Sequence, residues 1–165
     1  MDKGQGQTPA TAPVRAQQAA RPLVEDILGF CKPELESHTI DAHIDDQAPG
    51  ATLYADAGQL KQACLNLIIN AIDAMPEGGC LTVRISREED YTVIGIADTG
   101  EGIAPDMLER IFTPFVTTKA SGTGLGLAKV FSIMDSHDGR IECISEKDVG
   151  ATFNLYIPAH GGDET

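Results

Sequence analysis

A helical pattern between Asp56 and Met75 constrains the fold of this 165-residue chain more than any other feature of its sequence. Asp56 opens the segment, and apolar side chains then recur at steps of three or four, at Leu60, Cys64, Leu67, Ala71 and Met75. This spacing predicts a helix with one buried face. The sequence Pro76-Glu77-Gly78-Gly79 predicts where the helix ends.

Alternating patterns on both sides of this helix predict strands. The clearest are at 80–87 and 91–97, and shorter ones are predicted around 40–44, at 52–55, 140–145 and 152–157. Further helices are predicted from Pro22 onward, from Pro105 to Ile111, and around an inner stripe of Leu127, Val130, Phe131 and Met134. We therefore expect an α+β fold, a two-layer α/β sandwich in which helices cover one face of a mixed, mostly antiparallel sheet.

The composition predicts one globular domain with flexible ends. Residues 1–20 have few large apolar side chains, so we expect a disordered lead or an interdomain linker there. The folded domain is expected at residues 21–160, followed by a flexible tail at 161–165. No segment has the apolar length of a membrane span or the pattern of a signal peptide, which favours a soluble cytoplasmic domain without membrane insertion.

Charge and cysteine content exclude some classes of function. The net charge of −13 argues against binding along a nucleic-acid backbone, so no nucleic-acid partner is expected. Binding of a polyanion would depend on local donors and a cation. The four cysteines lie far apart without CxxC spacing, which predicts buried, reduced thiols rather than disulfides or a zinc site.

Three glycines at alternate positions, Gly122, Gly124 and Gly126, precede the apolar stripe of a predicted helix. They do not form a P-loop, because Lys129 follows Ala128 and not a glycine, and the GxGxG spacing does not match the dinucleotide GxGxxG pattern. Free backbone N–H groups at a helix N-terminus nevertheless favour an anion. Both a phosphate site and a plain flexible entry to the helix remain open on this pattern alone.

Two further patterns each have a functional and a structural interpretation. Asn66 and Asn70 lie one turn apart on one face of the helix that begins at Asp56; they either bond to neighbouring backbone or offer amide oxygens to a hard cation such as Mg²⁺. Asp98 ends an apolar strand and is followed by Gly100 and Gly102. This is either a common turn or a carboxylate placed to accept a hydrogen bond from an exocyclic amine in an apolar pocket.

Taken in order, NxxxNAxxA on a helix, DxGxG after a strand, and FxPF with a lysine and GxGxG before a helix resemble the ATP-binding catalytic domain of sensor histidine kinases. The wider superfamily includes type II topoisomerases, Hsp90-like chaperones and MutL-like ATPases. The resemblance covers about residues 22–158, and the segments DAMPEGG, FTPFVTTKASGTGLGLA and GATFNLYIP are most similar to the nitrogen-regulation type. It implies a Bergerat-type ATP-binding fold with ATP and Mg²⁺ as ligands.

The resemblance implies a role for the first two motifs. Asn70 matches the Mg²⁺-coordinating asparagine of the N box, and Asn66 lies one turn earlier, on the phosphate side. Asp98 matches the carboxylate that binds the adenine amino group, and Gly100 and Gly102 match the close turn of the G1 box. Ile103, Thr118 and Thr123 are assigned to the same nucleotide site.

The resemblance also assigns the glycine-rich stretch. Phe112 and Phe115 match the F box, and residues 113–123 match the ATP lid, whose only cation, Lys119, would reach the terminal phosphates. Gly122, Gly124 and Gly126 match the G2 box, whose backbone N–H groups, with those of Leu125 and Leu127, would meet the phosphates. Asn66 and Lys119 are accordingly the expected catalytic residues.

Two positions depart from the family pattern. Ala151 stands where a hydroxyl often supports the adenine site, which raises the question whether Thr152 replaces it. His137 in SHDGRI matches a histidine of the usual turn before a strand, and we interpret it as structural.

The resemblance implies transfer of the γ-phosphoryl group of ATP to a histidine on a separate dimerisation domain, and from there to a response regulator. None of the four histidines lies in the acceptor setting of the family, and no dimerisation hairpin precedes Pro22, so we expect an isolated, monomeric ATP-binding domain. Alternatives are a non-catalytic nucleotide-binding module that regulates a partner, or a serine kinase of the anti-sigma type.

Overall fold

The computed structural model describes residues 12–102, 123–146 and 148–161. Its main sheet has five strands in the order β2-β4-β5-β7-β6. Only the pair β2–β4 is parallel, and the other three neighbouring pairs are antiparallel. The strands are β2 (Ile40–Asp46), β4 (Gly79–Glu88), β5 (Tyr91–Asp98), β6 (Arg140–Glu146) and β7 (Gly150–Pro158). The predicted α+β class with a mixed, mostly antiparallel sheet is confirmed.

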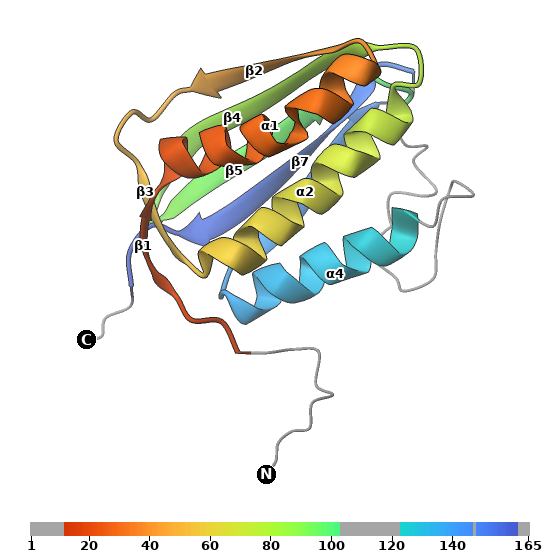
Figure 1. Cartoon of the computed structure of the whole chain (residues 1–165). Helices are drawn as coiled ribbons and strands as arrows, with labels where there is room; N and C mark the ends of the chain where they lie inside the picture. The colour runs from red at the N-terminus through yellow and green to blue at the C-terminus, as the bar shows by residue number, and fades with distance from the viewer. Residues whose placement is uncertain (1–11, 103–122, 147, 162–165) are drawn as a thin grey trace.

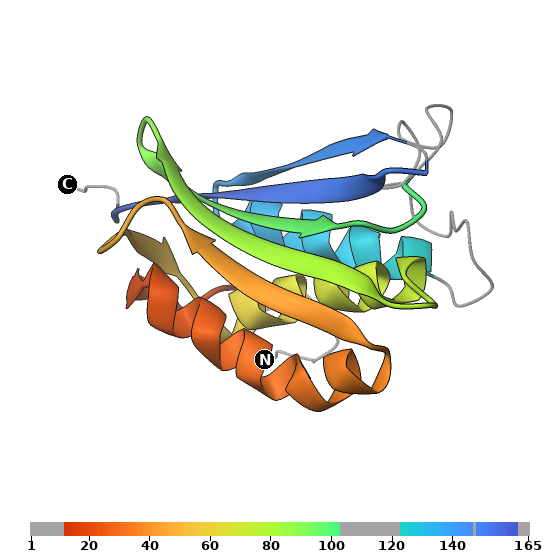
Figure 2. The ribbon, with the colours of Figure 1, turned by 90° about the horizontal axis from the view of Figure 1, so that it is seen from above.

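Three helices lie side by side across one face of this sheet (Figure 1). They are α1 (Ala20–Ser37), α2 (Ala57–Ala74) and α4 (Thr123–Ser136). Viewed from above, sheet and helices form two layers (Figure 2). The core between the layers is mostly aliphatic, with fully buried Leu60, Leu67, Ile94, Met134 and Leu155 among its largest side chains. The predicted two-layer sandwich is confirmed as well.

The alternation of side chains along each strand decides what faces the helices. In β5, Ile94 and Ile96 belong to the core, so the even-numbered positions point to the helical layer. Asp98 continues this set and lies opposite Leu81, which is fully buried. The carboxylate at the end of β5 therefore emerges on the face that the helices cover.

A small second sheet precedes the first helix. β1 (Ala16–Ala19) pairs antiparallel with β3 (Thr52–Ala55). Regular structure thus begins before residue 21, the position at which the sequence predicts that the folded domain starts. The sequence AQQA has no apolar alternation of its own; its backbone is held by pairing with β3, whose Leu53 and Ala55 are buried.

The helix stripe of α4 differs from the prediction at one position. Leu127, Val130 and Met134 are buried as expected, but Phe131 is 51% exposed and Ile133 takes its place in the core. The predicted helix at 105–111 lies outside the described residues. All four cysteines are free, with Cys31 and Cys64 buried and Cys80 and Cys143 half-buried. No described helix has both the length and the apolar character needed to cross a membrane.

Candidate nucleotide-binding site

The motifs singled out in the sequence converge at one end of the sandwich. β5 ends and β7 begins there, next to the end of α2 and the start of α4 (Figure 1). α2 and α4 pack together and run in opposite directions, so the second half of α2 lies near the first turns of α4. This end of the molecule therefore brings Asp98, the two asparagines and the N-terminus of α4 into one region.

Asp98 is held in place by backbone donors from two segments. Its Oδ1 accepts hydrogen bonds from the N–H of Gly100 at 2.8 Å and from the N–H of Ala151 at 3.3 Å. The side chain is half-buried. Both of these donors belong to the backbone and so hold the carboxylate in a fixed orientation, and the adenine-binding role that the resemblance implies requires such a fixed acceptor.

Two glycines let the neighbouring backbone close around this carboxylate. A Cβ on Gly100 would collide with the carbonyl oxygen of Ala74, at the end of α2. Gly150 has a φ of +149°, and a Cβ there would collide with the carbonyl oxygen of Asp98. The turn after β5 is further tied to α2 by the N–H of Glu101, which donates to the Ala74 carbonyl at 3.3 Å. The position of Asp98 is thus fixed relative to α2.

The two asparagines of α2 differ in how their amides are satisfied. The Oδ1 of Asn66 accepts from Nε2 of Gln62 at 3.0 Å, one turn earlier on the same helix. The Nδ2 of Asn70 is buried and has no hydrogen-bond partner, and it is the only such side-chain atom in the described part of the chain. A buried amide without a partner costs about 1–3 kcal/mol, which favours a ligand that completes its bonding.

Asn70 fits the cation site that the family implies. Mg²⁺ prefers oxygen donors, keeps several waters and needs only one or two protein ligands when phosphates supply the rest. The amide oxygen of Asn70 is the atom that would bind the cation, and the Nδ2 without a partner would donate to an acceptor such as a phosphate oxygen. The described residues contain no cluster of three or more His, Cys, Asp or Glu side chains that could hold a metal by themselves.

The N-terminus of α4 provides backbone donors at the same end. The helix begins at Thr123, so its residues without an acceptor one turn earlier are 123–125, which include Gly124 and Leu125, and regular helical bonding starts with the N–H of Gly126. Leu127 follows them, and its side chain is 5% exposed and packed in the core. The structure therefore places Leu127 as a packing residue and not among the free N–H groups.

Thr152 is not brought to this site. It pairs with Ala97, whereas Asp98 lies on the other face of the sheet. The neighbouring Ala151 is buried on the Asp98 face and contributes its N–H instead of a hydroxyl. The predicted contacts Ile103, Phe112, Thr118, Lys119 and Gly122 lie outside the described residues, and the side chain of Thr123 does as well.

One residue near the site was missed by the sequence analysis. Cys143 on β6 lies on the helical face, opposite Phe153. Burial raises the pKa of its thiol to about 12, and the Asp98 carboxylate contributes to the same shift. Cys143 is therefore a neutral apolar neighbour of Asp98. The alternation in β6 indicates its face, but only the pairing through β7 places it near Asp98.

Comparison with known proteins identifies the family to which this arrangement belongs. Residues 55–161 match the sequence model described as histidine kinase-, DNA gyrase B- and HSP90-like ATPase. The chain belongs to this ATPase family. The matched residues include α2, the turn after β5, α4 and β7, and so every part of the site described above.

Relatives within the family are sensor histidine kinases. The chain is 44% identical over 108 residues to the sensor histidine kinase ZraS of Escherichia coli K12, a match that covers 66% of this chain and 23% of that protein. Among solved structures, the nucleotide-free catalytic domain of histidine kinase ThkA has a TM-score of 0.80 at 27% identity, covering 88% of this chain and 95% of that one.

A second solved structure contains a nucleotide analogue. Full-length ShkA in complex with AMPPNP has a TM-score of 0.81 at 29% identity, with 92% of this chain and 33% of that chain covered. The chain thus contains the ATP-binding catalytic domain of the sensor histidine kinase type, and its match spans 23% of the length of ZraS.

Proposed function

We propose that this domain binds ATP with Mg²⁺ and transfers the γ-phosphoryl group to a histidine on a separate dimerisation domain. The observation that carries the proposal is the Asp98 carboxylate, which the N–H groups of Gly100 and Ala151 fix on the face that the helices cover, at the end of the molecule where α2 carries the buried Nδ2 of Asn70 without a partner. A response regulator would then receive the phosphoryl group from the histidine.

Asp98 would recognise the adenine. An ionised carboxylate only accepts hydrogen bonds, so it pairs with the exocyclic amine of adenine and opposes the carbonyl that guanine carries at the same ring position. Core side chains of β5, with Cys143 and Ala151 nearby, give the ring an apolar surface. This part of the site selects the nucleotide and sets where its phosphates lie.

The phosphates would lie between α2 and the start of α4. The N–H groups of residues 123–125 point out of the helix end and favour an anion there. Asn70 would offer its amide oxygen to Mg²⁺, which supplies charge neutralisation at the terminal phosphates. Lys119, with Phe112 and Thr118, is proposed to act from the segment that precedes α4, with Ile103 and Gly122 at its two ends.

Asn66 supports transfer to a protein acceptor over hydrolysis. In the hydrolytic branches of the superfamily a glutamate at this position acts as general base on water. An amide cannot take up a proton at neutral pH, and here its oxygen already accepts a bond from Gln62. The domain would therefore position ATP for in-line attack by an external nucleophile, which requires little further chemistry from the protein.

Labelled ATP distinguishes this proposal from its two alternatives. The chain is mixed with the histidine-bearing dimerisation domain of the same kinase and with γ-labelled ATP, and the product is tested for stability in acid. Acid-labile label on the dimerisation domain is expected, and Asn70→Ala should abolish it. ATP binding without transfer would support a non-catalytic nucleotide-binding module. Acid-stable label on a serine would support a kinase of the anti-sigma type.

A further inference from the structure

The end of the molecule opposite the candidate site contains a second polar cluster, which the proposed function does not use. There the N-terminal segment meets the start of α2 and the end of α4. The N–H of Val14 donates to Oδ2 of Asp56 at 2.9 Å, and Asp56 is the N-cap of α2 through a bond from the N–H of Gln59. The first described residues are therefore joined to the beginning of α2.

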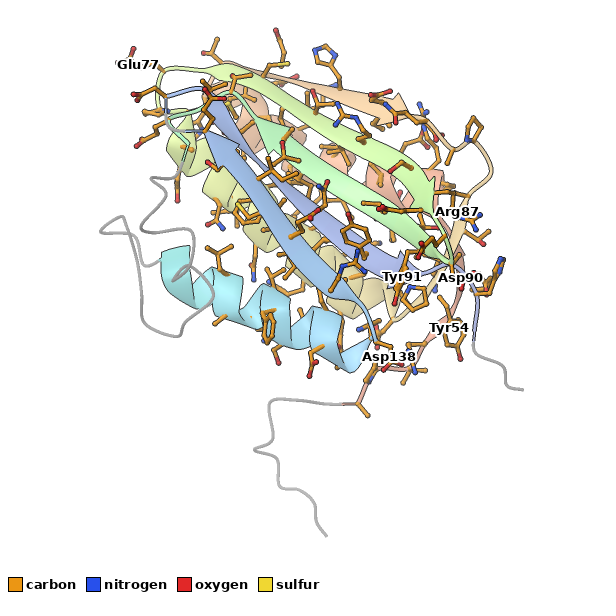
Figure 3. The ribbon with its side chains drawn as sticks, turned by 180° about the vertical axis from the view of Figure 1, so that it is seen from behind. Tyr54, Glu77, Arg87, Asp90, Tyr91 and Asp138 are labelled. Carbon is orange, nitrogen blue, oxygen red and sulfur yellow. The ribbon has the colours of Figure 1, made fainter. Side chains whose placement is uncertain are left out.

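Arg15 joins the same segment to the end of α4. Its Nη1 donates to the carbonyl oxygen of His137 at 3.3 Å and forms an ion pair with Oδ2 of Asp138 at 3.1 Å. Its guanidinium also lies 5.2 Å from the centre of the Tyr54 ring on β3. Figure 3 shows Tyr54 and Asp138 at this end, far from Glu77, which follows α2 at the other end.

His137 connects the two helices directly. The ring is 1% exposed, and its Nε2 accepts the N–H of Asp56 at 3.0 Å. Because Nε2 accepts, the proton of the neutral ring lies on Nδ1, which donates to the carbonyl oxygen of Ile133 at 2.9 Å. The interpretation of His137 as structural is confirmed by these contacts. Val14, Arg15, Asp56, His137 and Asp138 together form what we call the anchor cluster.

The anchor cluster lies at the far ends of the two helices that build the candidate site. α2 carries Asn66 and Asn70, and α4 begins with the proposed phosphate donors. A helix of 14 residues is about 21 Å long, so a tilt of about 5° at the anchored end moves the other end by ~2 Å. Displacements of about 1 Å at a reacting centre are enough to change activity severely.

We propose that the anchor cluster fixes the angle between α4 and α2, and that nucleotide binding therefore depends on how the segment Val14–Ala19 is held. Arg15 is the positioning residue of this cluster, because it contacts both the end of α4 and the ring of Tyr54 from within the N-terminal segment. A displacement or rotation of the residues before Val14 would be transmitted to α2 and α4 through two hydrogen bonds and one ion pair. This inference rests on the proposed nucleotide site.

The test compares two arginines. Arg15→Ala removes the contacts to α4, whereas Arg21→Ala removes ion pairs to Glu25 on α1 and Asp46 on β2, near the same end of the molecule. The affinity for Mg·ATP is measured by titration well below the unfolding midpoint of each variant. We expect Arg15→Ala to weaken binding about 3- to 10-fold and Arg21→Ala to leave it within about twofold. Arg15→Lys should restore part of the loss.

Two further measurements keep the result decisive. Asp138→Asn removes a carboxylate whose side chain is 76% exposed and retains a residue that tolerates the φ of +59° at this position, so it should weaken binding in the same direction without unfolding the chain. Hydrogen exchange should become faster in α4 for Arg15→Ala and not for Arg21→Ala. Wild-type affinity in both Arg15→Ala and Asp138→Asn would overturn this inference but not the proposed function. Failure of the wild-type chain to bind Mg·ATP would overturn both.

Discussion

The two ends of the sandwich use their polar groups differently. At the anchored end, the buried and capping groups of the anchor cluster are paired: Asp56 accepts two N–H groups and both ring nitrogens of His137 are bonded. At the other end, Asn70 has a buried Nδ2 without a partner, and α4 begins with N–H groups that no helical bond can use. The paired polar groups at the anchored end stabilise the domain, and the polar groups without partners at the other end are available to bind a ligand.

This difference is physically reasonable. A buried polar group without a partner lowers stability, so a folded protein retains one mainly where a ligand completes the bonding. Mutations at the two ends should accordingly have different effects. Changes at the candidate site should affect nucleotide binding more than folding, and changes at the anchored end should affect folding or helix position first.

The largest expected effect is on nucleotide binding in Asn70→Ala. Loss of the amide should weaken Mg·ATP binding roughly 100-fold, because an oxygen ligand for the cation is removed. The free energy of unfolding should stay unchanged or rise by up to about 1 kcal/mol, since an unsatisfied group leaves the interior. Calorimetric titration and urea unfolding measure the two quantities. Asn154→Ala, an amide on the open face of β7, is the control that should bind normally.

The converse experiment is His137→Ala at the anchored end. The N–H of Asp56 loses its acceptor and a cavity forms, so the free energy of unfolding should fall by about 1–3 kcal/mol. His43→Ala on the exposed edge of β2 should stay within about 0.5 kcal/mol of the wild type. Equal stabilities of the two histidine variants in urea would contradict the distinction between the ends.

A smaller effect is expected from restoring the hydroxyl at the start of β7. Ala151 lies on the Asp98 face and Thr152 on the opposite one, so Ala151→Thr should strengthen ATP binding about threefold, while Thr152→Val should leave it unchanged. Competition with a fluorescent ATP analogue would measure both. A loss in Thr152→Val as large as the gain in Ala151→Thr would show that the register argument is wrong.

The smallest expected effect is a pH dependence at Asp56. The hydrogen bond from the N–H of Val14 is the largest cause of a lowered pKa of this carboxyl. A pKa that is lower in the folded than in the unfolded chain adds stability above the unfolded value of 3.8, and this stability is lost as the pH falls through the folded value. Thermal unfolding midpoints should therefore fall less below about pH 4 in Asp56→Asn than in the wild type or in Asp41→Asn.

The sequence predicts the scaffold better than the contacts between distant segments. The periodicity of α2 and the alternation in β4 and β5 predict their extents closely, because one face of each is buried in the core. α4 shows where this fails. Phe131 and Ile133 both fit a helical stripe near Val130, and only packing against the neighbouring elements places Ile133 inside.

The candidate site could be predicted where the motif carries the chemistry itself, as for Asp98 and Asn70. Partners separated by many residues could not. The bond from Ala151 to Asp98 follows from the register of β5 and β7, and the ion pair of Arg15 with Asp138 joins positions 123 residues apart. The sequence AQQA gave no signal for β1, because a four-residue strand of small and polar residues has no periodicity to detect.

The most direct test of the proposed site compares ATP and GTP binding in the wild type and in Asp98→Asn. In the variant, the N–H groups of Gly100 and Ala151 would hold the amide oxygen, which turns the NH₂ group toward the base and sets donor against donor with adenine. We predict that the wild type binds Mg·ATP more tightly than Mg·GTP. In Asp98→Asn, the affinity for ATP should fall at least about tenfold and the preference for ATP over GTP should become smaller. Unchanged ATP affinity and unchanged preference in Asp98→Asn would contradict the assignment of this end of the sandwich as a nucleotide site.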